Sequence, residues 1–159
     1  MSHLLILPYC VFDISAIDGR VKLLLAAIDK GTPESIKMGG ITADFNIQVA
    51  IDGINADFEC FITTGNLYKF YKELQECYNN LNGTAVLKYH SEKLTRISVD
   101  FKNTGKCTIY GYAQTNSYKR NRIEFCIECD QTYIEPNIKM MEILFDELAA
   151  LQGFYEFPY

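Results

Sequence analysis

The chain has little of what most enzymes and nucleic-acid-binding proteins need. Only two histidines, His3 and His90, can act as imidazoles near neutral pH, and neither lies in a recognisable motif. Fifteen Lys and Arg residues against twenty Asp and Glu leave a net charge of −5. This balance disfavours nucleic acid as a partner, because phosphate binding needs a basic surface. No glycine-rich loop opens a helix after a strand as a phosphate cradle requires. A basic protein is the more natural partner.

Long apolar runs, targeting signals and linkers are also missing. No run approaches the roughly 18 apolar residues that span a bilayer. The apolar stretch 4–7 has no preceding Lys or Arg and is cut by Pro8, unlike a signal peptide. We therefore expect a soluble, cytoplasmic protein with no membrane partner. Without repeats or linkers, residues 1–159 form one predicted domain. It comprises N-terminal strands and a loop (1–43), a core (44–153) and an aromatic tail (154–159), which we expect to cover the core rather than to serve as a docking peptide.

Six cysteines are present, but a domain of this size needs no disulfides. Cys126 and Cys129 have the spacing of a redox or zinc motif, yet Ile123, Phe125 and Ile127 alternate around them as in a strand. In a strand the two thiols point to opposite faces about 10 Å apart, too far for a disulfide or a shared metal. We expect reduced core cysteines, no metal site and no cofactor.

The clearest element is a predicted helix over residues 64–81, whose apolar positions are spaced for one buried face. Thr63 or Thr64 can cap its free amides, and Gly83 can close it in the left-handed conformation. A second helix is predicted after a capping box at 132–135, with Ile134, Ile138, Met141, Phe145 and Leu148 as its apolar stripe and Gly153 as its end.

Strand patterns flank the first helix on both sides. The dipeptide Asp52-Gly53 favours a two-residue hairpin turn, and Phe58, Cys60 and Ile62 share one face of the strand after it. We predict an α+β fold in which both helices pack on one face of an antiparallel meander sheet. The predicted strands cover 4–12, 20–28, 44–51, the segment after Gly53, 85–90, 94–101, 106–113 and 122–129.

The outward sheet face is the most informative predicted surface. Strands that put Phe58, Ile97 and Phe125 inward must put acidic side chains outward, together with two tyrosines. Aromatic anchors among carboxylates suit a protein interface, and an ordinary solvated sheet face is the alternative. The predicted partner-binding residues are Asp57, Glu59, Tyr110, Tyr112, Glu124 and Glu128, with Asp100 as a further outward acid.

The strongest enzymatic hypothesis uses Asp57 and Glu59. Two residues apart on one strand face, their carboxylates would lie ~7 Å from each other, a separation compatible with inverting glycosidases. Such pairs are common on solvated strands, and no pattern signals a pocket that would shift a pKa. We therefore predict no catalytic residues.

Three segments carry a family resemblance: FITTGNLYKF at 61–70, LNGTA at 81–85 and DQTYI at 130–134. Together with the order of hairpin, helix, four-strand meander and final helix, they resemble WapI-type immunity proteins, the small cytoplasmic antitoxins of bacterial polymorphic, contact-dependent toxin systems. The resemblance covers most of the chain. It implies a non-enzymatic protein that binds the toxin domain of its own lineage, often a nuclease, and blocks its active site or substrate surface. It carries over no binding residues.

An acidic inhibitor would complement the basic cleft that a nuclease presents to its substrate. The alternative function is a regulatory or ligand-binding module that holds a peptide or small ligand in the sheet concavity.

Overall fold

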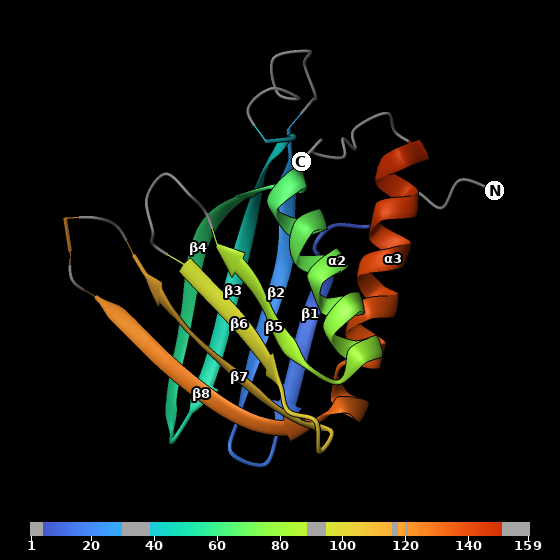
Figure 1. Ribbon diagram of the computed structural model, residues 1–159. Helices are drawn as coiled ribbons and strands as arrows, with labels where there is room; N and C mark the ends of the chain where they lie inside the picture. The colour runs from blue at the N-terminus through green and yellow to red at the C-terminus, as the bar shows by residue number, and fades with distance from the viewer. Residues whose placement is uncertain (1–4, 30–38, 89–94, 116–117, 120, 151–159) are drawn as a thin grey trace.

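The computed structural model describes residues 5–29, 39–88, 95–115, 118–119 and 121–150. Within these ranges the chain forms two four-stranded antiparallel sheets and two α-helices (Figure 1). The predicted α+β class and the antiparallel meander are confirmed. The strands divide between two sheets, however, where the sequence pattern predicted one.

The first sheet contains four consecutive strands, and its central turn is the predicted one. Asp52 and Gly53 have φ angles of 48° and 79°, the left-handed conformations that a two-residue hairpin turn of type I′ requires. The first strand pairs with the second as predicted, but it begins after Pro8, which has no amide to donate. A register shift at Val11 buries it and the following residue together, which breaks the alternation. The strands are β1 (Tyr9–Ala16), β2 (Gly19–Ile28), β3 (Thr42–Ile51) and β4 (Ile54–Thr63).

The second sheet is the predicted meander, with strands in chain order. It consists of β5 (Gly83–Lys88), β6 (Thr95–Phe101), β7 (Lys106–Gln114) and β8 (Arg122–Asp130). Residues 89–94, which the sequence pattern also placed in strands or a turn, lie outside the described residues. The inward side chains of both sheets belong to one continuous hydrophobic core, so the two inner faces point toward each other.

Helix α2 spans Thr64–Asn80, close to its predicted bounds. The Thr63 side chain caps it by accepting a hydrogen bond from the Asn66 amide, as predicted for Thr63 or Thr64. Its left-handed cap is Leu81, with a φ of 49°, and not Gly83 as predicted. The left-handed cap thus lies two residues before the predicted one, and the amides of Leu81 and Asn82 both bond to the carbonyl of Cys77. Gly83 instead begins β5, where a Cβ would lie 3.0 Å from the Cys77 sulfur.

Helix α3 spans Glu135–Ala150 and follows a 3₁₀ turn, η1, at Gln131–Tyr133. The predicted capping box does not form, because the Thr132 hydroxyl and amide both donate to the Asp130 carboxylate. The predicted apolar stripe is confirmed: Ile138 is half-buried and the other four members are buried. The predicted helix end at Gly153 and the aromatic tail lie outside the described residues.

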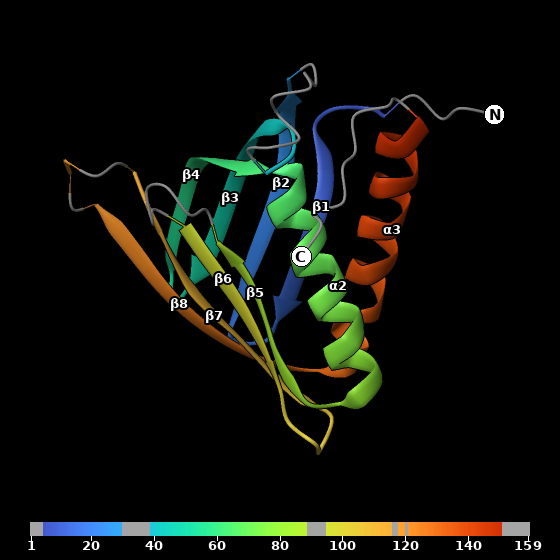
Figure 2. The same ribbon diagram turned by 45° about the horizontal axis from the view of Figure 1, so that its top comes forward.

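Both helices lie on the same side of the molecule, beside β1 and β5 (Figures 1 and 2). The ring of Phe70 on α2 meets Phe12 of β1 edge-to-face at 5.9 Å. Phe145 of α3 contacts two tyrosines of α2, with ring centroids 5.1 Å from Tyr68 and 5.3 Å from Tyr71. The edge strands β4 and β8 lie on the side opposite β1 and β5 over most of their length, and only their C-terminal ends, which lead into α2 and toward α3, approach the helices.

Candidate partner-binding surfaces

The structure divides the six predicted partner-binding residues between two sheets. Two of them lie on β4 of the first sheet, and four lie on β7 and β8 of the second. All point outward: Tyr112 is half-buried and the other five are exposed. Because the inner faces share one core, the two outer faces point away from each other. The prediction of a single outer face is therefore wrong, since residue alternation shows which side chains point outward but not which strands share a sheet.

The outer face of the first sheet is charged and internally hydrogen-bonded. Gln48 Nε2 donates to Asp57 Oδ2 at 3.0 Å from the neighbouring strand. Arg20 binds the Asp13 carboxylate through two hydrogen bonds of 2.7 and 2.9 Å. A hollow of about 350 Å³ lies between these groups, lined by Asp57 but not by Glu59. In the described part of the chain this hollow does not bring the two acids together, so it gives no support to the hypothesis of a paired-carboxylate hydrolase.

The outer face of the second sheet carries an arginine and tyrosine cluster that the sequence analysis missed. The Arg122 guanidinium lies 3.8 Å from the centre of the Tyr112 ring and 2.7 Å from Glu124 Oε1. Tyr112 is flanked on its other side by Arg96, its cross-strand partner on β6. These residues and Tyr110 line a hollow of about 500 Å³. The sequence pattern could have revealed this cluster. Arg96 and Arg122 each lie an even number of residues from an outward-facing acid on the same strand, so alternation places them on the outer face as well.

A glycine shapes the floor of this hollow. A Cβ at Gly111 would lie 1.9 Å from the carbonyl oxygen of Arg96 and 3.0 Å from the Phe125 ring. Such a contact is impossible, so only glycine permits β6 and β7 to approach this closely. Tyrosine and arginine are the side chains most enriched at binding hot spots. The hollow therefore has the composition of a protein-recognition surface.

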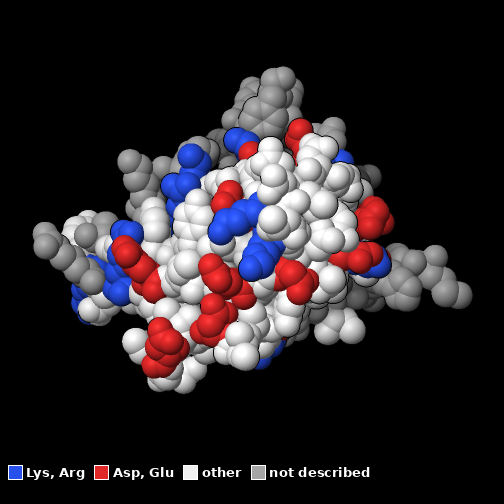
Figure 3. Space-filling model, turned by 60° about the horizontal axis from the view of Figure 1, so that its bottom comes forward, with Lys and Arg blue, Asp and Glu red and all other residues white. Residues whose placement is uncertain are grey.

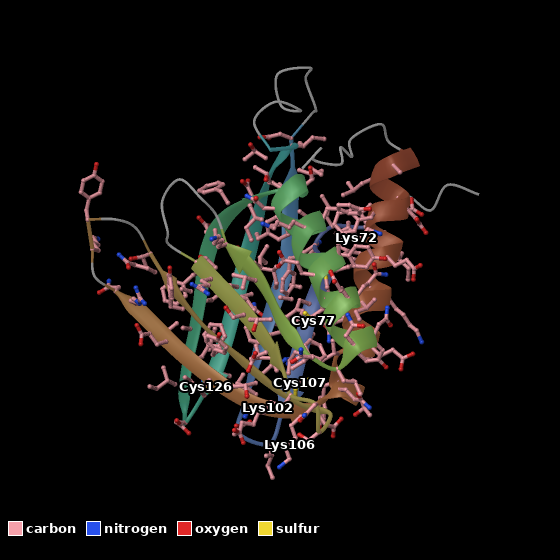
Figure 4. All side chains as sticks on the ribbon, viewed as in Figure 1. Lys72, Cys77, Lys102, Lys106, Cys107 and Cys126 are labelled. Carbon is pink, nitrogen blue, oxygen red and sulfur yellow. The ribbon has the colours of Figure 1, made fainter. Side chains whose placement is uncertain are left out.

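Charge varies along this face instead of being uniformly acidic. One end holds Lys88 in the same cross-strand row as Arg96, and the other holds Asp100 and Glu128. Lys102 and Lys106 lie near the β6–β7 turn (Figure 4). Figure 3 shows acidic side chains gathered around a smaller basic group on the end of the molecule that carries this turn. Asp100 and Glu128 thus form an acidic end of this face, whereas Glu124 lies in the row of Arg96 and Lys88.

The cysteines provide no metal or redox motif of the CxxC kind. Cys126 is exposed on the outer face of β8, whereas Cys129 is half-buried on the inner face, as the alternation predicted. Cys129 instead lies directly opposite Cys107 on β7, and its thiol donates a hydrogen bond to the Cys107 sulfur. This bond raises the pKa of Cys129 and lowers that of Cys107. Burial raises the pKa of Cys60 to about 12.

The described ranges hold neither a metal-binding cluster nor a membrane-crossing helix. Among those residues, no three His, Cys, Asp or Glu side chains are grouped closely enough to hold a metal ion. Neither α2 nor α3 has the length and apolar character of a membrane-crossing helix in the part of the chain that is described. His3 and His90 lie outside it.

Comparison with known proteins identifies the family. The family model for the immunity protein WapI-like family matches residues 22–150, from the second strand to the end of α3. Searches of curated proteins and of solved structures give no significant match. The match covers most of the chain, including both helices and every described strand except β1 and the start of β2, and it agrees with the three segments that carried the resemblance. The chain belongs to the WapI-like immunity protein family.

Proposed function

We propose that this protein neutralises a cognate bacterial toxin by binding its toxin domain in the cytoplasm and covering the toxin's active site or substrate surface. The observation that carries this proposal is the family match over residues 22–150. Inhibition of this kind is stoichiometric and uses no catalytic residues, cofactor or metal of the immunity protein. Its physical requirements are an exposed, well-ordered surface and a complementary charge pattern.

We propose further that the toxin domain is a nuclease. A nuclease presents a basic cleft to its phosphate substrate, and a negatively charged inhibitor is steered toward such a cleft. The net charge of −5 and the acids gathered at one end of the molecule support this choice. Asp18 and Asp130 add to the exposed acids beside Glu128, whose amide bonds to the Asp18 carboxylate at 3.0 Å.

The proposed binding surface is the side of the molecule away from the helices. There the edge strands β4 and β8 carry four of the predicted residues, Asp57, Glu59, Glu124 and Glu128, and the tyrosines of β7 lie next to β8. Arg122 is held by the Tyr112 ring and by Glu124, so less side-chain entropy remains to be lost on binding. Tyr110 is 38% exposed and can serve as an aromatic anchor.

Paired charge reversals test this surface. Changing Glu124→Lys with Glu128→Lys should weaken binding of the cognate toxin domain at least ~10-fold, chiefly through complementary charge. The matched control, Glu142→Lys with Asp146→Lys on the exposed face of α3, makes the same change in net charge on the helix side. Equal losses in the two double variants would show that only the net charge matters and would reject the surface. Titration calorimetry with the cognate toxin domain measures the dissociation constants of both double variants.

A ligand-binding module is the alternative, and one hollow bears on it. This hollow, of about 600 Å³, lies between β1, η1 and α3, a size suited to small ligands. Its buried amide, Asn137, already hydrogen-bonds to the Asp13 backbone and to the Tyr133 carbonyl. The alternative predicts a metabolite retained by the purified protein, which native mass spectrometry would reveal.

A further inference from the structure

The two sheets together have four edge strands, and three of these edges are capped by side chains from other elements. Asn137 of α3 pairs with β1, accepting from the Asp13 amide at 2.6 Å and donating to its carbonyl at 3.1 Å. Glu73 of α2 accepts from the Val86 amide of β5 at 3.0 Å. The β1–β2 turn caps β8 through Asp18 and the Glu128 amide. Unpaired edges are templates for pairing with another chain, and each of these three edges is closed at one residue by such a cap.

The fourth edge strand, β4, has no such cap in the described part of the chain. The two-residue turn and the bond of 2.9 Å from the Thr64 amide to the Ile41 carbonyl fix the alternation of its ladder to β3. The amides and carbonyls of the even-numbered residues form the hydrogen bonds to β3. The amides and carbonyls of odd-numbered residues therefore point away from the sheet, and no hydrogen bond from another described element reaches them. These residues are Asn55, Asp57, Glu59 and Phe61.

The side chains of this open edge define what can pair with it. Asp57 and Glu59 are exposed on the outer face, while Ile54 and Phe61 are 57% and 52% exposed near the two ends. Phe58, on the inner face, is only half-buried at the rim of the core. A complementary strand would thus place basic side chains outward and apolar side chains inward.

A second copy of this chain is a poor occupant. In an antiparallel pairing of two β4 strands, outward-facing residues must lie opposite each other. The register centred on Phe58 sets Asp57 of each copy opposite Glu59 of the other. Like charges in direct cross-strand contact are unfavourable. The acids thus block self-association while leaving the edge open to a basic segment, a common device of natural edge strands.

We propose that β4 accepts an extended segment of the cognate toxin domain, which joins the first sheet as an additional antiparallel or parallel strand. Main-chain hydrogen bonds to the four odd-numbered residues supply affinity, and alternating basic and apolar side chains supply specificity. Because the occupant is the toxin, this pairing rests on the proposed function. It also places Asp57 and Glu59, which lie on a different sheet from the other predicted residues, in the same complex.

Hydrogen exchange of individual amides tests the pairing in the intact protein. Free protein should show fast exchange at Asp57, Glu59 and Phe61 and slow exchange at Phe58 and Cys60, which bond to β3. In complex with the recombinant cognate toxin domain, the three fast amides should become protected at least ~10-fold. A tight, neutralising complex in which these amides still exchange as in the free protein would overturn the pairing and leave the proposed function standing. Absence of any binding or neutralisation would overturn both.

Proline substitution gives a second, independent test. Relative to Asp57→Ala, which removes the carboxylate bound by Gln48, Asp57→Pro additionally removes only an outward amide, so the ladder to β3 stays intact and the toxin loses one hydrogen bond and close approach. Its affinity should fall at least ~10-fold, and Glu59→Pro should act likewise if the first variant folds poorly. Ser15→Pro is the matched control, because it removes an outward amide from the exposed β1 edge beside α3. An unchanged dissociation constant in a folded Asp57→Pro or Glu59→Pro variant would refute strand pairing.

Discussion

Replacing Asn137 by alanine tests how the fold protects its first sheet edge. The side chain is 1% exposed and forms three hydrogen bonds: from the Asp13 amide at 2.6 Å, to the Asp13 carbonyl at 3.1 Å and to the Tyr133 carbonyl at 2.7 Å. Each is worth about 0.5–1.5 kcal/mol net, and the backbone groups left behind are partly buried. We expect Asn137→Ala to lower the free energy of unfolding by about 2–4 kcal/mol.

Urea denaturation followed by far-ultraviolet circular dichroism measures this loss as a lower midpoint at unchanged slope. Asn79→Ala, at an exposed position near the end of α2, is the matched control and should change stability by less than about 0.5 kcal/mol. Asn137→Asp keeps an acceptor for the Asp13 amide but faces two carbonyls without a donor, so it should also destabilise. If Asn137→Ala proved no more destabilising than Asn79→Ala, the amide would not be the cap that the geometry indicates.

Two further predictions concern the interior. Gly111→Ala should lower the free energy of unfolding by at least about 1–3 kcal/mol in the same denaturation assay, because the added carbon would lie 1.9 Å from the Arg96 carbonyl oxygen. An unchanged free energy of unfolding would show that β6 and β7 can separate without cost. Above pH 9 the unfolded chain releases the Cys60 proton, whereas the folded chain holds it until about pH 12, so stability should fall as pH rises through this window. The Cys60→Ala variant should lose less stability than the unchanged protein between pH 9 and pH 12. An identical loss in the two proteins would contradict the raised pKa of Cys60 as its cause.

Local sequence patterns predicted most of the secondary structure, because the elements satisfy local rules. The Asp52-Gly53 turn, the Thr63 cap and the apolar stripe of α3 each depend on residues close in the chain. The failures lie where a tertiary contact decides. The division of the strands between two sheets depends on which edge strands contact helices. The Asp130 side chain caps η1 in place of the predicted capping box, because this 3₁₀ turn begins one turn before α3.

The candidate surfaces were predictable in part for the same reason. Strand alternation correctly predicted that Asp57, Glu59 and Glu124 point to solvent. It could not show that β4 and β8 belong to different sheets, nor that Arg122 packs on Tyr112, since both facts depend on cross-strand register. The open edge of β4 was also invisible in the sequence, because its recognition depends on knowing which residues cap the other three edges.

The measurement that tests the central claim most directly combines binding and neutralisation. The cognate toxin domain is expressed alone and together with this protein, and growth of the host and stoichiometry of the purified complex are recorded. We predict that growth is arrested by the toxin domain alone and restored by co-expression, with a one-to-one complex in which nuclease activity is blocked. Continued growth arrest, or a toxin domain that stays active and unbound beside an excess of folded protein, would contradict the assignment of this protein as its inhibitor.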